Sequence, residues 1–193
     1  ELSAVIQEKL LSQERTLSRI SYLVKSLLDL SRLEMTDTLD KEPIKLNELI
    51  ASVAEEFQGL MLEQHLRFTT DMADPLIIHA DREKIRRVLI NLLDNAIRYT
   101  QPQGEIRCRA FADGEQVTLV VANTGPGIGQ EDLIRVFDQF YRCEKSRSTA
   151  RGGSGLGLTI VKRIVEMHKG GITVERIDSN WIAFTITFPV GNE

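Results

Sequence analysis

The sequence Asn91-Leu-Leu-Asp-Asn95-Ala-Ile-Arg98-Tyr99 repeats apolar residues at helical spacing, and two glycine-rich stretches follow it, Asn123-Thr-Gly-Pro-Gly-Ile-Gly129 and Gly153-Ser-Gly-Leu-Gly157. Asn91 and Asn95 lie four residues apart, so both carboxamides share one face of the predicted helix, and amide oxygens are suitable ligands for Mg²⁺. Glycines permit positive φ and let the backbone approach a ligand closely. The second glycine stretch opens directly into a helical pattern, whose free N–H groups favour phosphate. Together the three stretches predict a nucleotide site.

The composition is that of an ordinary globular protein, with 193 residues of which 42% are hydrophobic and 27% are charged. The formal net charge of −4 argues against a broad nucleic-acid surface, so no nucleic-acid partner is expected. The two cysteines, Cys108 and Cys143, lack metal-ligand spacing, which favours reduced thiols in the cytosol. No stretch approaches the roughly 18 consecutive apolar residues of a membrane span. Because the sequence begins at Glu1 and not at a methionine, we expect a fragment of a longer protein.

A long amphipathic helix is expected at the start of the chain. Its seam alternates in steps of four and three through Ile6, Leu10, Gln13, Leu17, Ile20, Val24 and Leu27, and is widened by Leu23, Leu28, Leu30 and Leu33. A seam of this width predicts packing against a partner helix in a bundle. The pattern ends near Met35, and Pro43 disfavours helix in the polar run before it. We therefore expect a helix over 1–35, a linker over 36–43 and a main domain over 44–193.

The main domain is expected to combine strands and helices. Strands are predicted at 44–46, at 66–70 and 76–79 on either side of a turn-like Ala73-Asp-Pro75, and in two hairpins at 106–112 with 116–122 and 172–176 with 181–188. Helices are predicted from Asn47, as N-cap, to Glu63, from Asp81, as N-cap, through Asn91 and Asn95, at 130–137, and at 156–168 with Gly170-Gly171 as its stop. The fold class is therefore α+β, a two-layer α/β sandwich with a mixed, antiparallel-rich sheet covered by three helices.

Four motifs in this order resemble those of sensor histidine kinases. The Asn91 stretch resembles the N-box, the two glycine stretches resemble the two glycine boxes, and Phe137-Asp-Gln-Phe-Tyr-Arg142 resembles the F-box between them. The segment Leu27-Leu-Asp-Leu-Ser-Arg-Leu-Glu34 also resembles the end of the second helix of the family's dimerisation and phosphoacceptor hairpin. That segment distinguishes kinases from other members of the same GHKL ATPase superfamily. The resemblance covers residues 1 to about 190.

The resemblance implies that ATP and Mg²⁺ are bound, and it gives roles to residues of this sequence. Asn95 and Asn91 would hold the metal, and with Arg98 and Arg142, which would reach the phosphates, they would form the catalytic set. Tyr99 would pack near adenine, although an ordinary half-buried tyrosine is the alternative. The other nucleotide contacts would come from Asn123, Gly125, Gly127, Ile128, Gly153, Ser154, Gly155, Leu156 and Gly157. The cations Lys145, Arg147 and Arg151 would belong to a lid over the phosphates or, alternatively, to a solvated basic loop.

One departure from the family pattern is Asn123, because the first glycine box usually begins with an aspartate that accepts a hydrogen bond from the adenine amino group. An asparagine keeps one acceptor and gains a donor, so adenine selectivity should survive. Loss of the charge should weaken binding by about 1 kcal/mol. We therefore expect weak but specific ATP binding.

A second departure is the absence of the family's acceptor-histidine motif. The sequence contains only His65, His79 and His168, and all three are expected to be structural, with His168 as a cation at a helix end. The acceptor helix is expected to precede Glu1. The fragment should therefore be unable to autophosphorylate alone.

The resemblance implies transfer of the γ-phosphoryl group of Mg·ATP to a histidine outside this fragment, for relay to an aspartate of a response regulator. The full-length protein is expected to be a homodimer that includes the missing phosphoacceptor helix. It is also expected to be a membrane-anchored sensor, with this chain in its cytoplasmic portion. Two alternatives stay open, a related superfamily ATPase or serine kinase and a nucleotide-sensing adaptor with a degenerate site.

Overall fold

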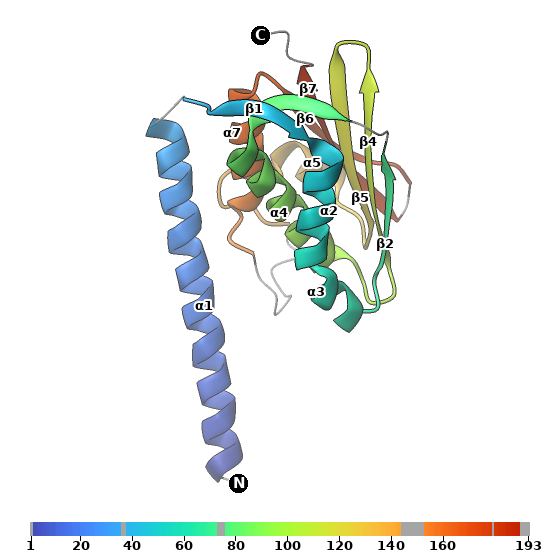
Figure 1. Ribbon diagram of the computed structural model, residues 1–193. Helices are drawn as coiled ribbons and strands as arrows, with labels where there is room; N and C mark the ends of the chain where they lie inside the picture. The colour runs from blue at the N-terminus through green and yellow to red at the C-terminus, as the bar shows by residue number, and fades with distance from the viewer. Residues whose placement is uncertain (1, 36–37, 73–75, 144–152, 179, 190–193) are drawn as a thin grey trace.

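The computed structural model describes residues 2–35, 38–72, 76–143, 153–178 and 180–189. In chain order its elements are α1 (Leu2–Met35), β1 (Lys41–Lys45), α2 (Leu46–Glu56), α3 (Gln58–Glu63), β2 (Arg67–Met72), β3 (Ile77–Asp81), α4 (Arg82–Tyr99), β4 (Glu105–Asp113), β5 (Gln116–Thr124), α5 (Gln130–Arg135), α7 (Gly157–Met167), β6 (Gly171–Arg176) and β7 (Trp181–Pro189). The long helix α1 lies beside the α/β part, and its N-terminal half extends past that part (Figure 1).

The main sheet has five strands in the order β2-β4-β5-β7-β6. Among the described strands of this sheet, only β2 and β4 run parallel, whereas β4 with β5, β5 with β7, and β6 with β7 are antiparallel. Helices α2, α4 and α7 lie on one face of this sheet (Figure 1). The expected two-layer α+β sandwich with a mixed, antiparallel-rich sheet and three covering helices is confirmed, as are both expected hairpins.

Strands β1 and β3 form a separate antiparallel two-stranded sheet. The strand expected to begin at Ile44 begins at Lys41, so residues 41–43 of the expected linker belong to β1. Pro43 is tolerated there, opposite His79, because the strand lies at an edge where a missing N–H costs little. Strands β2 and β3 do not pair with each other, and the expected turn at 73–75 lies outside the described residues.

The predicted caps of the first two domain helices have different outcomes. Asp81 caps α4 as expected, since its carboxylate accepts from the backbone N–H of Lys84 at 3.1 Å. The prediction that Asn47 is an N-cap is wrong, because α2 begins at Leu46 with Lys45 as its N-cap residue. Leu46 is fully buried, and this burial draws it into the first helical turn. The single helix expected to reach Glu63 is divided at Phe57 into α2 and α3.

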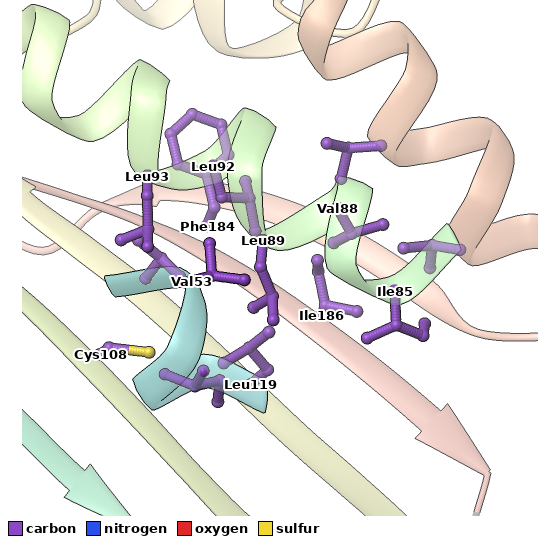
Figure 2. Packing of buried hydrophobic residues seen from close by; sticks show 14 of the residues in the cluster. Val53, Ile85, Val88, Leu89, Leu92, Leu93, Cys108, Leu119, Phe184 and Ile186 are labelled. Carbon is purple, nitrogen blue, oxygen red and sulfur yellow. The ribbon is translucent and has the colours of Figure 1, made fainter. Parts of the chain in front are cut away.

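Helix α4 fills the centre of the hydrophobic core. Its apolar face consists of Ile85, Val88, Leu89, Leu92 and Leu93, each no more than 1% exposed. These side chains pack against Val53 of α2 and against Leu119, Phe184 and Ile186 of the sheet (Figure 2). Each such side chain contributes about 1.5–3 kcal/mol on burial, so this face fixes the rotation of α4 about its axis. The opposite, polar face is thereby held toward the glycine-rich loops.

Cys108 also lies in this core (Figure 2). Burial raises the pKa of its thiol to about 12, so the thiol stays protonated at neutral pH. Cys108 and Cys143 are both free, as expected.

The end of α7 differs from expectation in two ways. Lys169, and not a glycine, adopts the left-handed conformation, with φ of 58°. The Lys169 and Gly170 N–H groups donate to Glu166 and Val165 at 2.9 Å each, which is a Schellman ending. Gly170 serves a different purpose, since a Cβ there would lie 2.3 Å from the carbonyl oxygen of Thr187.

His168 is buried and joins α7 to the start of α4. Its Nε2 accepts from the Asp81 backbone N–H at 3.0 Å, so Nδ1 carries the proton and donates to Ile164 at 2.7 Å. Burial lowers the pKa of His168, which makes the neutral form the stable one. The prediction that His168 is a cation stabilised by the helix dipole is therefore wrong. The other two histidines, His65 and His79, are exposed.

The last turns of helix α1 contact the domain. Ser26, Leu30 and Leu33 are buried, and Asp29 pairs with Arg87 of α4. The seam residues Leu10 and Leu17, in contrast, are 58% and 64% exposed. The expected apolar seam is therefore open along α1. None of the described helices is long and apolar enough to cross a membrane.

Candidate nucleotide-binding site

A cavity of about 530 Å³ lies where the polar face of α4 meets the two glycine-rich stretches. This volume is within the range of about 300–1,000 Å³ that is usual for ligand pockets. Its walls are formed by Asn91, Asp94, Asn95, Arg98, Tyr99, Thr100, Gln101, Pro102, Asn123, Gly125, Pro126, Gly127, Ile128, Val136, Tyr141, Arg142, Cys143, Gly153, Ser154, Gly155, Gly157, Leu158, Ile182 and Phe184. The structure thus brings all but one of the nucleotide-site residues expected from the sequence to one cavity. The exception, Leu156, is fully buried beside it.

The polar face of α4 supplies two amides and a cation. The Nδ2 of Asn91 donates to the carbonyl oxygen of Arg87 at 2.8 Å, which fixes the orientation of that carboxamide. Its Oδ1 lies 3.0 Å from the place where a Cβ on Gly157 would stand. Arg98 donates to Asp94 at 2.7 Å one turn earlier on the same helix. Successive spacings of four and three residues, from Asn91 to Asn95 and from Asn95 to Arg98, therefore place amide oxygens and a guanidinium along one wall.

Asn123, at the end of β5, is 3% exposed and faces the cavity. Its Nδ2 donates to the carbonyl oxygen of Thr124 at 3.2 Å, so Oδ1 is the atom that can accept from a ligand. The next glycine, Gly125, packs on the end of α4, where a Cβ would lie 2.7 Å from the Tyr99 carbonyl oxygen. This arrangement suits recognition of an amino group on a ligand.

The second glycine stretch lies against the polar face of α4, with Gly157 beside Asn91 and Gly153 beside Arg98. Ser154 Oγ accepts from the Leu156 N–H at 3.1 Å, which closes the turn before α7. Gly155 has φ of 74°, and a Cβ there would lie 2.7 Å from the backbone of Phe140. Gly157 is the first residue of α7 and lines the cavity, so the N-terminus of an 11-residue helix meets the cavity. Free N–H groups at such a terminus favour a phosphate group.

Residues 140–143 contact both α5 and the second glycine stretch, and three of them, Tyr141, Arg142 and Cys143, line the cavity. The first residue of this segment is Phe140. Phe140 has φ of 62°, which is unusual for a bulky residue and costs about 1–2 kcal/mol. Its N–H donates to the Gly155 carbonyl oxygen at 3.0 Å. The hydroxyl of Tyr141 donates to Asp132 of α5, and this bond is the main reason that the Tyr141 pKa is raised. The next residue, Arg142, lines the cavity.

The sequence did not predict the apolar wall of the cavity. It consists of Val136, Leu158, Ile182 and Phe184, together with Ile128, which was expected. Ile182 and Phe184 alternate along β7 and face the helices. That alternation was visible in the sequence, but it does not say which inward residues border a cavity.

The expected lid and the expected metal site are only partly covered by the described residues. Lys145, Arg147 and Arg151 of the expected lid lie outside them. Within the described part of the chain, no group of three or more His, Cys, Asp or Glu side chains is placed to hold a metal. The cavity wall does contain the amide side chains of Asn91 and Asn95, and amide oxygens together with phosphate oxygens are a donor set that Mg²⁺ accepts.

Residues 80–192 match the family described as histidine kinase-, DNA gyrase B- and HSP90-like ATPases. Because the match covers more than half of the 193 residues, the chain belongs to this family. The phosphate regulon sensor protein PhoR of Pseudomonas aeruginosa is 34% identical over 171 residues, which are 88% of this chain and 39% of that protein. The chain therefore spans about two-fifths of the length of this relative.

Solved structures of histidine kinases share the fold. Full-length ShkA in complex with AMPPNP has a TM-score of 0.81 at 26% identity, over 96% of this chain and 39% of that one. Histidine kinase ThkA in complex with the response regulator TrrA has a TM-score of 0.77 at 29% identity, over 91% of this chain and 48% of that one. These likenesses confirm the expected family and fold. The described domain is of the ATP-binding catalytic type found in sensor histidine kinases.

Proposed function

We propose that this chain binds Mg·ATP and transfers its γ-phosphoryl group to a histidine on a helix that is not part of the chain. The observation that carries the proposal is the convergence of two α4 amides, Asn123 and the α7 N-terminus on one cavity. A buried amide is suited to bind the adenine end of ATP, and a helix N-terminus is suited to bind its phosphate end.

Different residues of the cavity would bind the adenine, the metal and the phosphates. Asn123 Oδ1 would accept from the adenine amino group, and Tyr99 would pack near the base. Asn95, with Asn91 beside it, would hold Mg²⁺, which neutralises phosphate charge and aligns the phosphate oxygens when it is bound. Arg98 and Arg142 would contact the phosphates, and the glycine stretches would let the backbone approach them. Positioning and charge neutralisation are the protein's contribution, since phosphoryl transfer needs little covalent chemistry from the enzyme.

The three histidines of the chain do not suit the role of phosphoacceptor. His168 is buried and engaged at both ring nitrogens. His65 and His79 are exposed but do not line the cavity. The acceptor would therefore lie outside the chain, on the first helix of a hairpin whose second helix is α1. The open apolar seam of α1 supports this arrangement, and the chain alone would not autophosphorylate.

The same proposal extends to partners and location. A response regulator would receive the phosphoryl group, as suggested by the solved complex of ThkA with TrrA. The full-length protein would be a homodimer, in which the hairpin completes the bundle around α1. It would be anchored in the membrane, with this chain on the cytoplasmic side.

The experiment follows the fate of the γ-phosphoryl group. The chain extended upstream by its natural sequence is incubated with γ-labelled ATP and Mg²⁺, and the label is traced. Label on protein that is lost in acid but stable in alkali identifies phosphohistidine and supports the kinase. Acid-stable label on serine, or label released only as inorganic phosphate, would favour the related serine kinase or ATPase. Absence of nucleotide binding would favour the adaptor.

A matched pair of variants makes this test specific. Asn95→Ala removes an amide from the cavity wall, whereas Asn180→Ala removes an exposed amide that does not line the cavity. We expect the first variant to abolish labelling and the second to retain it. Equal labelling of both would contradict the role proposed for Asn95.

A further inference from the structure

Helix α5 contributes no predicted contact to the nucleotide, yet it makes two contacts with one residue of the cavity wall. Asp132 accepts a hydrogen bond from the hydroxyl of Tyr141, and the Arg135 guanidinium lies 4.3 Å from the centroid of the Tyr141 ring. The two α5 residues are three positions apart, so they share one face of the helix. Tyr141 is therefore held at its polar end by an anion and over its ring by a cation.

The chain next to Tyr141 is strained and needs such support. Phe140 has a left-handed φ of 62°, and its side chain is 57% exposed. Burial of the Phe140 ring therefore does not hold this conformation. Support comes from both sides of the segment, through the Phe140 N–H to Gly155 at 3.0 Å and through Tyr141 to α5.

Arg142 directly follows Tyr141 and lines the cavity. A backbone fixed at 140 and 141 determines the direction in which the Arg142 side chain leaves the chain. We propose that Asp132, with Arg135, acts as a positioning residue: it anchors Tyr141 and so presents Arg142 to the phosphate groups of the nucleotide. This inference rests on the proposed function.

Cys143 adds to the same arrangement from the other side of Arg142. Burial raises the pKa of its thiol, and the charge and a hydrogen bond of Asp132 raise it further. One carboxylate thus faces the residues on both sides of Arg142. Asp132 therefore influences the position of the whole segment 141–143, and not only that of Tyr141.

The test separates the phosphate end from the adenine end of the ligand. Titration of the 193-residue chain with Mg·AMPPNP and with adenosine is compared between wild type and Asp132→Ala. We expect Asp132→Ala to weaken AMPPNP binding about tenfold, the size expected for loss of a charge-assisted hydrogen bond, while adenosine affinity changes less than about twofold. Tyr141→Phe should act in the same direction and should add little in the double variant.

Two further variants guard the interpretation. Asp132→Asn keeps an oxygen acceptor for the Tyr141 hydroxyl but loses the charge, so its AMPPNP affinity should lie between those of wild type and Asp132→Ala. Glu131→Ala removes the neighbouring, exposed acid of the same helix and should leave both affinities unchanged. If both affinities fall equally in Asp132→Ala, or neither changes, the positioning role is overturned. A wild-type chain that binds no AMPPNP would instead overturn the proposed function itself.

Discussion

At the residue scale, the most informative position is Asn123, where one atom separates this chain from the usual aspartate. The carboxamide is almost fully buried and donates to its own neighbour, Thr124, so its oxygen is left to recognise a ligand. A neutral acceptor gives a weaker hydrogen bond than a charged one. Under the proposed function, Asn123 would accept a hydrogen bond from adenine in the same direction as an aspartate, but the bond would be weaker.

Asn123→Asp is expected to tighten ATP binding about fivefold, because a charge-assisted bond gains about 1 kcal/mol over a neutral one. The ligand-free variant should unfold more readily, since it buries an unpaired charge. Isothermal titration and thermal unfolding measure the two effects. Asn123→Ala is the control and should weaken binding. Tighter binding by the alanine variant would contradict the hydrogen-bonding role of this side chain.

Local sequence rules predicted the ends of some helices correctly and the ends of others wrongly. Asp81 was predictable as a cap because an acid before an apolar-periodic helix has a local function. Asn47 was predicted as a cap by the same rule, but this prediction is wrong. Leu46 is buried and is the first residue of α2, so Asn47 lies inside the helix. Lys169 takes the left-handed position beside two available glycines, because Gly170 is required where the chain passes the Thr187 carbonyl. Tertiary contacts decided both exceptions.

At the scale of elements, α4 and α7 carry the site, and a buried histidine joins their far ends. His168 accepts from the Asp81 N–H and donates to Ile164, so protonation of Nε2 would remove the first of these bonds. Its pKa is lowered from 6.5, first by burial. The sequence predicted the helices but not this connection, which depends on two residues 87 positions apart.

The pH dependence of stability follows from this connection. Because the folded-state pKa of His168 lies below the unfolded value of 6.5, the unfolded chain binds more protons in the window between the two. The stabilisation is fully present above pH 6.5 and is lost as pH falls from 6.5 toward the folded pKa. Urea unfolding at pH 7.5 and pH 5.5 measures it. His168→Gln should remove this slope.

The exposed histidines provide the matched control for that experiment. His65→Gln and His79→Gln alter side chains at the surface and should retain the slope of wild type. A wild-type protein that becomes more stable as pH falls through this window would contradict the assignment of a neutral, buried His168.

At the scale of the whole molecule, the helical layer and the sheet could be predicted from the periodicity of the sequence, whereas only part of the cavity lining could. Both hairpins and the three covering helices follow from local patterns. The pairing of β1 with β3 joins short strands far apart in sequence and has no local signal. The apolar wall from β7 required the complete sheet, because inward residues look alike until their neighbours are known.

The attachment of α1 to the domain is a second property of the whole molecule. Asp29 and Arg87 pair beside the buried Leu30 and Leu33. Both charged side chains are partly exposed, so the pair contributes at most about 1 kcal/mol. Asp29→Ala should increase hydrogen exchange in the last turns of α1 and leave the α4 core protected. Lys25→Ala, on the exposed side of α1, is the control, and equal exchange in both variants would contradict the role of the pair.

Binding of Mg·ATP in the cavity between α4 and the glycine stretches is the property on which the proposed function depends most. Isothermal titration of the 193-residue chain with AMPPNP and Mg²⁺ tests it directly. We expect one ligand per chain, competition by ATP but not by GTP, and loss of binding in Asn95→Ala with unchanged circular dichroism. No binding at millimolar nucleotide, or equal competition by GTP and ATP, would contradict it.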